Sequence, residues 1–146
     1  MSEELDDSLY ARITELSDQG NDYVEDGNFD EAIEKYKEAL ALMPEPIEEW
    51  EASTWLMTAL GETYFFKQDY KNALQTLQNA MHCPDAIGNP LIHLRLGQVQ
   101  FEVGNQARAK DELARAYMGG GEEIFEDEDP KYLDLVKKTL RPPIGS

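Results

Sequence analysis

Apolar side chains recur along this chain with the period of an α-helix, in segments separated by short polar turns. The first segment carries its apolar residues at Leu9, Ile13, Leu16, Tyr23 and Val24. Later segments repeat this periodicity. Each ends at residues that stop helices, such as a glycine-asparagine pair or a proline, which disfavours helical angles in the residue before it. The pattern therefore predicts an all-α chain.

The helical segments fall into three pairs. Each pair is expected to form a helical hairpin, over residues 9–44, 47–84 and 90–118. A glycine recurs at a matched place in the first helix of each pair, at Gly20, Gly61 and Gly97. Because a glycine has no side chain, we expect each one to mark a point where two helices approach closely.

These residues resemble the tetratricopeptide repeat (TPR) family, whose pattern is W-x2-L-G-x2-Y…A-x3-F…P. The middle pair follows this pattern at Met57, Leu60, Gly61, Tyr64, Tyr70, Ala73, Leu77, Ala80 and Pro84. The first pair follows it at Leu16, Gly20, Tyr23, Ala32, Tyr36, Ala39 and Pro44. The third pair departs from it, since Gln100 replaces the aromatic residue and Gly121 stands where the proline is expected. The resemblance covers about residues 11–117.

The resemblance implies a right-handed α-solenoid of three TPR hairpins within a single domain, residues 1–146. Residues 119–130 are interpreted as an acidic linker. Residues 131–140 have amphipathic spacing and are predicted to form the helix that caps the C-terminal end, as repeat arrays require. The spacing of 41 residues between the first two glycines exceeds the usual 34, and we interpret Ile47 to Ser53 as two extra turns at the front of the third helix.

Charge narrows the class of partner. Thirty acidic and thirteen basic residues give a net charge of −17, and residues 1–51 alone hold 17 acids and 3 bases, a net of −14. Such a surface repels nucleic acid and anionic membranes and speeds encounter with a basic protein. The alternative interpretation is that the charge serves solubility alone.

Candidate chemistry is sparse. The single cysteine, Cys83, excludes an internal disulfide, and no apolar run reaches the length of a membrane span. With no signal peptide expected in residues 1–10, we predict a cytoplasmic protein. His82, Cys83 and His93 lack the spacing of a zinc site, and Asp127 to Asp129 lack that of a calcium loop. We therefore expect no catalytic, cofactor or metal site.

The family resemblance places a binding groove along the first helix of each hairpin. The residues predicted to contact a partner there are Asp18, Asn21, Glu25, Trp55, Glu62, Phe65, Phe66, Arg95, Gln98, Phe101 and Glu102. The predicted groove is aromatic at its centre and acidic at one end, and aromatic side chains are common anchors of binding energy. The alternative is that Phe65, Phe66 and Phe101 pack between repeats.

One function known in the family depends on five residue types, which can be compared with the residues at the matching positions of this sequence. TPR co-chaperones hold the C-terminal carboxylate of heat-shock chaperones with Lys, Asn, Asn, Lys and Arg. The matching positions here are Ser17, Asn21, Ala59, Leu91 and Arg95. Both lysines are missing and acids surround their positions, so this carboxylate clamp is disfavoured.

The sequence thus predicts a non-catalytic protein-interaction module that binds a basic protein partner. In size, charge and acidic tail the chain resembles small stand-alone bacterial TPR proteins that serve as immunity partners of secreted toxins. This resemblance implies an immunity protein that neutralises a cognate bacterial toxin by covering its basic surface. The alternative is a general TPR adaptor or secretion chaperone that holds an extended peptide in the groove.

Overall fold

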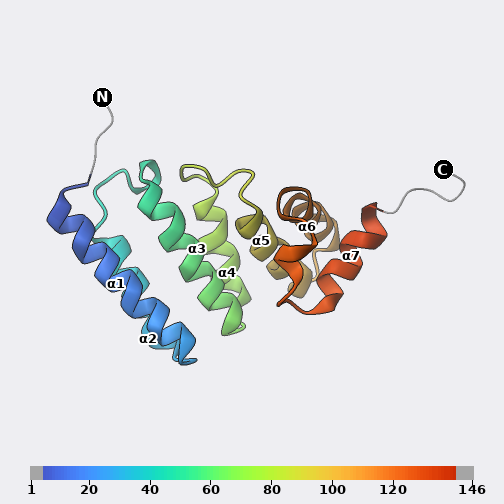
Figure 1. The fold of residues 1–146 in the computed structure, drawn as a ribbon, viewed down its shortest axis with the longest axis horizontal. Helices are drawn as coiled ribbons and strands as arrows, with labels where there is room; N and C mark the ends of the chain where they lie inside the picture. The colour runs from blue at the N-terminus through green and yellow to red at the C-terminus, as the bar shows by residue number, and fades with distance from the viewer. Residues whose placement is uncertain (1–4, 141–146) are drawn as a thin grey trace, which may run out of the picture. The chain divides into compact units, whose positions relative to one another are not determined.

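The chain is helical throughout the part that the structure, a computed structural model, describes, which is residues 5–140 (Figure 1). These residues form seven α-helices and two short 3-10 helices, and no strand lies among them. The elements are α1 (Asp7–Glu25), α2 (Phe29–Ala41), η1 (Ile47–Glu49), α3 (Glu51–Phe66), α4 (Tyr70–Ala80), α5 (Pro90–Glu102), α6 (Gln106–Gly120), η2 (Glu122–Phe125) and α7 (Pro130–Leu140). The predicted all-α fold of helical hairpins is confirmed.

The helices divide into two compact units that meet in sequence at residues 84 and 85. In unit 1, the hairpins α1–α2 and α3–α4 pack against each other through α2 and α3 (Figure 1). In unit 2, α5 and α6 form the third hairpin, and η2 and α7 pack on it. That the two units act as one domain stays a prediction.

Close helix approach explains the glycines of the sequence pattern. A Cβ atom built on Gly20 would lie 2.7 Å from the Tyr36 ring, and one built on Gly61 would lie 2.6 Å from Cγ of Leu77. Both distances are far inside van der Waals contact, so a larger residue would push the paired helices apart. The two hairpins of unit 1 are therefore closed in the same way, by a glycine in one helix and a large side chain in the other.

The segment between the first two hairpins differs from the prediction. Residues 47–53 do not extend the third helix by two turns, because Trp50 adopts extended backbone angles (φ −103°, ψ 134°) between η1 and α3. The indole Nε1 of Trp50 donates a hydrogen bond to the Pro44 carbonyl oxygen at 2.9 Å. Ile47 packs against the buried cluster of Met57, Ala80 and Cys83. Burying these apolar side chains favours a segment that folds back over one that projects into solvent.

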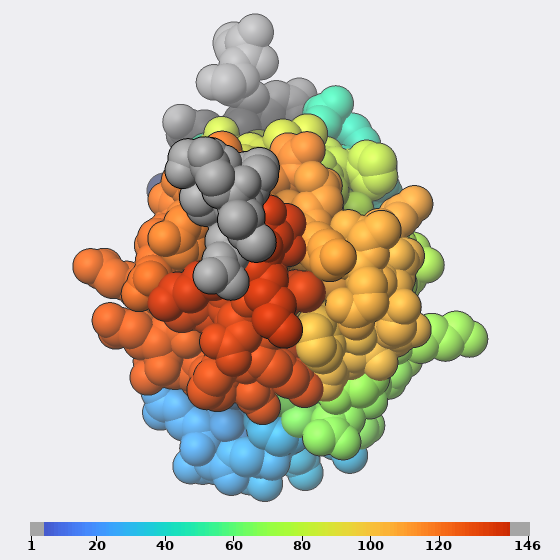
Figure 2. Space-filling view, turned by 90° about the vertical axis from the view of Figure 1, so that its right-hand side faces the viewer, coloured from blue at the N-terminus to red at the C-terminus, as the bar shows by residue number. Residues whose placement is uncertain are grey.

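The C-terminal region is more ordered than a linker. α6 continues through Gly119 and Gly120, and after Gly121 (φ +68°) η2 begins and buries Phe125. α7 starts at Pro130, one residue before the predicted capping helix, and buries Tyr132 and Val136. In Figure 2, which looks onto this end of unit 2, α7 is the red helix. The apolar residues among the acids of 119–130 explain why this stretch packs on the unit.

Candidate protein-binding site

A pocket of about 240 Å³ lies in unit 1 where α1, α2 and α3 meet. Its lining residues are Asn21, Val24 and Glu25 from α1, Tyr36 from α2, and Ala59, Glu62, Thr63 and Phe66 from α3. The structure thus brings together four of the residues that the sequence predicted to contact a partner, namely Asn21, Glu25, Glu62 and Phe66. We refer to this site as the α1–α3 pocket.

Helical spacing places these side chains. On α1, Asn21, Val24 and Glu25 are three and four residues apart, so they share one face of the helix. On α3 the same rule aligns Ala59 with Glu62 and Phe66. The small side chain of Ala59 leaves open the space that a larger residue would fill.

Tyr36 supplies the polar part of the pocket wall. It is almost fully buried, and its hydroxyl donates a hydrogen bond to Oδ1 of Asn21 at 2.6 Å. Burial, reinforced by the negative charge of Glu62, raises the pKa of Tyr36 to about 12. The phenol therefore stays protonated at neutral pH and holds Asn21 in place.

Phe66 forms an aromatic edge of the pocket. The residue is 39% exposed, and its ring lies 6.1 Å, centre to centre, from the rings of both Phe29 and Phe65. Contacts of this kind orient aromatic rings. One face of unit 1 thus holds an accessible aromatic side chain that its neighbours keep in position.

The α1–α3 pocket is acidic. Glu25 and Glu62 are among its lining residues, and none of the eight is basic. Further acids, Asp18 and Asp22, lie exposed on the same helix as Glu25. The exposed carboxylates of Asp18, Asp22 and Glu25 give this face of α1 a negative charge that favours a positively charged ligand.

A larger groove of about 540 Å³ lies in unit 1 among α2, α3 and α4, and both acidic and basic side chains line it. It is lined by Asp30, Glu31, Ile33, Glu34, Lys37, Tyr64, Lys67, Asp69 and Asn72. Lys67 Nζ lies 2.5 Å from Asp30 Oδ1, and this hydrogen bond raises the pKa of Lys67. This groove therefore carries side chains of both charges, four acidic and two basic, whereas the lining of the α1–α3 pocket has no basic residue.

The other predicted contacts of unit 1 lie around the pocket. Trp55 is 37% exposed and lies four residues before Ala59 on the same stripe of α3. Asp18 is exposed one turn before Asn21 on α1. Phe65 instead is half-buried and lies 6.0 Å, centre to centre, from the Tyr70 ring of α4, so it contributes more to packing between helices.

In unit 2 the predicted groove face of α5 is covered by the chain itself. Arg95 and Gln98 are buried, at 8% and 0% exposure. Oε1 of Glu128 accepts hydrogen bonds from Nη1 of Arg95 at 2.6 Å and from Nε2 of Gln98 at 2.7 Å. The expectation that Arg95 and Gln98 face an open groove is therefore corrected, because the segment before α7 occupies their face.

The remaining two predicted residues of α5 meet α7 itself. The ring of Phe101 stacks edge-on against Tyr132 with centroids 5.4 Å apart. Nζ of Lys131 lies 2.9 Å from Oε1 of Glu102. Counting from the repeat glycine identified these faces of α5, but it carried no information about what folds back over them.

Sequence reasoning also missed part of the α1–α3 pocket. Tyr36, Val24 and Thr63 were not among the predicted contacts, and Ala59 was considered only as a clamp position. Tyr36 belongs to the second helix of its hairpin, whereas the prediction considered first helices only. The signal that could have found it is its pairing with Gly20, which places its ring beside α1.

Other residues that the sequence analysis considered for chemistry make contacts within the fold. His93 is buried, its Nε2 accepts the Gly88 amide hydrogen at 2.9 Å and its Nδ1 faces Glu112. Asn21 and Arg95, the two residues that match the carboxylate clamp, bond to Tyr36 and Glu128. No helix within residues 5–140 combines the length and apolar character needed to cross a bilayer.

Comparison with known proteins supports the TPR assignment. Residues 11–81, which cover most of the first two hairpins, match the tetratricopeptide repeat family model. No curated protein sequence matches the chain significantly. The immunity-protein resemblance is not confirmed by these comparisons.

Solved structures share the fold at low sequence identity. The C-terminal TPR-containing domain of a FK506-binding protein from Plasmodium falciparum is 19% identical, with a TM-score of 0.71 over 94% of this chain and 91% of that one. The second TPR domain of human RPAP3, in complex with an HSP70 peptide, is 16% identical, with a TM-score of 0.67 over 92% and 99%. The type III secretion translocator chaperone SycD of Yersinia enterocolitica is 12% identical, with a TM-score of 0.66 over 88% and 92%.

Proposed function

We propose that this TPR-type chain is a non-catalytic, cytoplasmic protein-interaction module that binds a basic protein partner through unit 1. The observation that carries the proposal is the α1–α3 pocket, which has two glutamates, an exposed aromatic edge and no basic lining residue. Its α1 and α2 walls belong to the most acidic part of the sequence, residues 1–51, with a net charge of −14.

Charge and aromatic surface have separate roles in this proposal. A negative field attracts a basic partner over several ångströms and raises the association rate, an effect that salt weakens. Trp55 and Phe66 then provide apolar contact area once the partner has docked. We expect the partner to cover the stripe of α3 that carries both aromatic residues, together with the acidic face of α1.

A more specific form of the proposal is an immunity protein that neutralises a cognate toxin. Toxins that act on nucleic acid carry basic surfaces, and an acidic protein that covers such a surface blocks the substrate. The support is the chain's charge together with its resemblance to small stand-alone bacterial TPR proteins. This form predicts a tight one-to-one complex with a folded partner.

The alternative is a general adaptor or secretion chaperone that holds an extended peptide in the groove. Two structural neighbours support it, since RPAP3 is seen with a peptide and SycD is described as a secretion chaperone. This form predicts weaker binding of a short linear segment. The peptide itself would have to be basic in this chain, because the α1–α3 pocket contains two glutamates.

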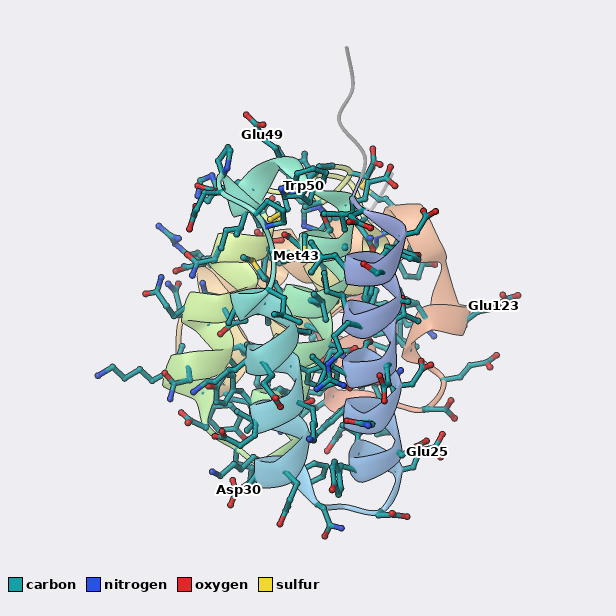
Figure 3. All side chains as sticks on the ribbon, turned by 90° about the vertical axis from the view of Figure 1, so that its left-hand side faces the viewer. Glu25, Asp30, Met43, Glu49, Trp50 and Glu123 are labelled. Atoms are coloured by element: carbon teal, nitrogen blue, oxygen red, sulfur yellow. The ribbon has the colours of Figure 1, made fainter. Side chains whose placement is uncertain are left out.

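Charge reversal with a matched control tests the proposal. A partner is first captured from the native host, identified and purified. Its affinity is then measured for the triple variant Asp18→Lys, Asp22→Lys and Glu25→Lys. The control is Glu45→Lys, Glu48→Lys and Glu49→Lys, which changes the net charge equally with three exposed residues outside the α1–α3 pocket. Figure 3 shows Glu49 and Glu25 at opposite ends of unit 1.

We expect the first triple variant to weaken binding strongly and the control to weaken it slightly. Circular dichroism should show equal helix content in both. Equal losses in the two variants would mean that net charge alone matters, and unchanged binding in the first would refute the proposed surface.

A further inference from the structure

We propose that His93 is a pH-sensitive switch for residues 85–89, which we call the connector because they lead from the end of unit 1 into α5. The neutral imidazole holds the connector, and the protonated imidazole releases it. This inference concerns unit 2 alone. It therefore goes beyond the proposed function, which assigns partner binding to unit 1.

Both ring nitrogens of His93 have partners, and these partners define the state of the imidazole. The residue is buried, with 3% of its surface exposed. Nε2 lies 2.9 Å from the backbone nitrogen of Gly88, and because that amide is a donor, Nε2 carries no proton. The proton of the neutral ring is then on Nδ1, which lies 2.5 Å from Oε2 of Glu112. The structure therefore holds the neutral form.

A second proton on the imidazole affects the two contacts differently. Nε2 becomes a donor and faces the donor amide of Gly88, so this hydrogen bond is lost. Nδ1 remains a donor to Glu112, whose carboxylate then faces a positive charge. Protonation thus strengthens the contact of His93 with α6 and breaks its contact with the connector.

The connector is a short turn that ends at Asn89, the residue that caps α5. The Asn89 amide donates a hydrogen bond to the Ala86 carbonyl oxygen at 3.0 Å, which closes the turn. The hydrogen bond from Gly88 to His93 attaches this turn to a buried side chain of α5. When that bond is lost, the turn keeps its internal hydrogen bond and loses this attachment.

The pairing of a histidine with an acid occurs in the third hairpin and not in the first two. At the matching positions, counted from the repeat glycine and from the large residue that faces it, the first hairpin has Leu16 and Lys35 and the second has Met57 and Thr76. Leu16 and Met57 are buried and cannot titrate. An apolar residue therefore suffices to fill this position, and His93 adds a property that packing does not require.

Glu112 is the charged residue that meets the imidazole. In unit 2, α6 and η2 pack on α5, and on α5 itself Arg95 is bonded to Glu128. The other charged residues of the connector, α6 and η2 are exposed to solvent, which screens their charge. They are Asp85, Arg108, Lys110, Asp111, Arg115, Glu122 and Glu123. The titration of His93 is thus governed by Glu112, which favours the second proton, and by the Gly88 amide and burial, which oppose it.

The test follows the Gly88 amide of the full chain by NMR from about pH 8 to about pH 5, the range in which histidines titrate. Its protection from hydrogen exchange is corrected for the exchange rate of an unstructured peptide at the same pH. We expect this protection to fall about fivefold to tenfold, the loss of one hydrogen bond, as the ring signals of His93 change. The amide of Val99, which is buried in α5, should keep its protection.

Three variants assign the effect to the pair. His93→Leu introduces the residue type found at position 16 and removes the acceptor, so Gly88 should be weakly protected at every pH in this range. Glu112→Gln keeps an acceptor for Nδ1 but removes the charge that stabilises the imidazolium. The loss of Gly88 protection should therefore move to lower pH. His82→Gln, at the exposed second histidine, is the control and should behave as the unmodified chain does.

Three results would overturn the switch. The first is constant protection of Gly88 across this pH range, and the second is a loss of protection that survives in His93→Leu. The third is a simultaneous loss of protection at Val99, which would identify acid unfolding instead. If His93→Leu does not fold, the Gly88 and His93 signals of the unmodified chain decide, because the switch requires them to change together. Partner binding by unit 1 is measured separately, so failure of one proposal leaves the other intact.

Discussion

Glu128 places its carboxylate on Arg95, with 2.6 Å between Oε1 and Nη1, although 33 residues separate the two in sequence. Arg95 is buried, so this contact balances a positive charge that is largely shielded from water. The same oxygen accepts a hydrogen bond from the amide of Gln98, which is also buried. One acidic residue before α7 therefore stabilises two polar side chains of α5 at once.

Replacing Glu128 by alanine should destabilise unit 2. The variant lacks the carboxylate that contacts buried Arg95. We therefore expect the free energy of unfolding to fall by about 2–4 kcal/mol. Urea denaturation followed by circular dichroism measures the change. Glu126→Ala, an exposed acid in the same segment, is the control and should change stability by less than about 0.5 kcal/mol. A small loss in Glu128→Ala would show that the contact contributes little.

Gly61→Ala should separate the helices of the second hairpin. The added Cβ would lie 2.6 Å from Cγ of Leu77, which has no room to move in a close-packed core. Overpacking costs about 1–3 kcal/mol, and the better helix propensity of alanine recovers up to roughly 1 kcal/mol. We expect a net loss in thermal unfolding experiments. Combining Gly61→Ala with Leu77→Val should recover part of that loss, and a neutral single variant would contradict the close approach.

Tyr36 makes stability depend on alkaline pH. Its pKa rises from 10.0 in the unfolded chain to about 12 in the fold, so folding favours the protonated phenol. The resulting stabilisation, about 2–3 kcal/mol, is complete below pH 10 and is lost as the pH rises from about 10 towards 12.

Urea unfolding at a series of alkaline pH values measures this dependence. The control variant Tyr36→Phe should lose the hydrogen bond to Asn21 and show a flatter pH profile than the unmodified chain in this range. Identical profiles for the two proteins would exclude Tyr36 as the cause.

Gln68→Gly should stabilise the chain. Gln68 lies in the turn between α3 and α4 with φ +68°, a left-handed conformation that costs a residue with a side chain about 1–2 kcal/mol. The corresponding turns of the other hairpins have glycine there, Gly27 with φ +78° and Gly104 with φ +89°. We expect Gln68→Gly to raise the free energy of unfolding by about 0.5–1 kcal/mol, after the entropy of the unfolded chain is counted. The reverse change Gly27→Gln should lower it, and opposite signs would refute the interpretation.

Trp55 separates the two forms of the proposed function. The side chain is 37% exposed, so Trp55→Ala also removes some buried apolar surface and should lower the thermal midpoint; binding is therefore compared at a temperature where the variant is fully folded. A peptide adaptor should lose most of its affinity in this variant, because a short segment depends on few anchors. An immunity protein on a folded toxin should lose less, and its association rate should respond more to salt than to Trp55. Isothermal titration and stopped-flow measurements distinguish these results.

The elements of this fold follow from local pattern. Apolar spacing, a proline after Asn89 and turn residues such as Gly27 each act within one or two helical turns, so most helix boundaries could be predicted to within about three residues. Gly20 and Gly61 likewise predicted that the two helices of each hairpin approach closely. By contrast, the interruption of the helix at Trp50 could not be predicted, because good helix formers surround this residue. The segment folds back because Ile47 packs against the buried cluster that contains Met57.

The sequence alone determined most of the helices, which helices pair, and that the N-terminal region is strongly acidic, since each of these depends on neighbours in the chain. Only the tertiary structure decided which faces remain open. Glu128 and Tyr132 cover the face of α5 that repeat counting had assigned to a partner. Tyr36 completes a pocket whose other walls belong to α1 and α3. The physical reason is that burial depends on side chains that meet across long sequence separations, and no periodicity records where a later segment folds back.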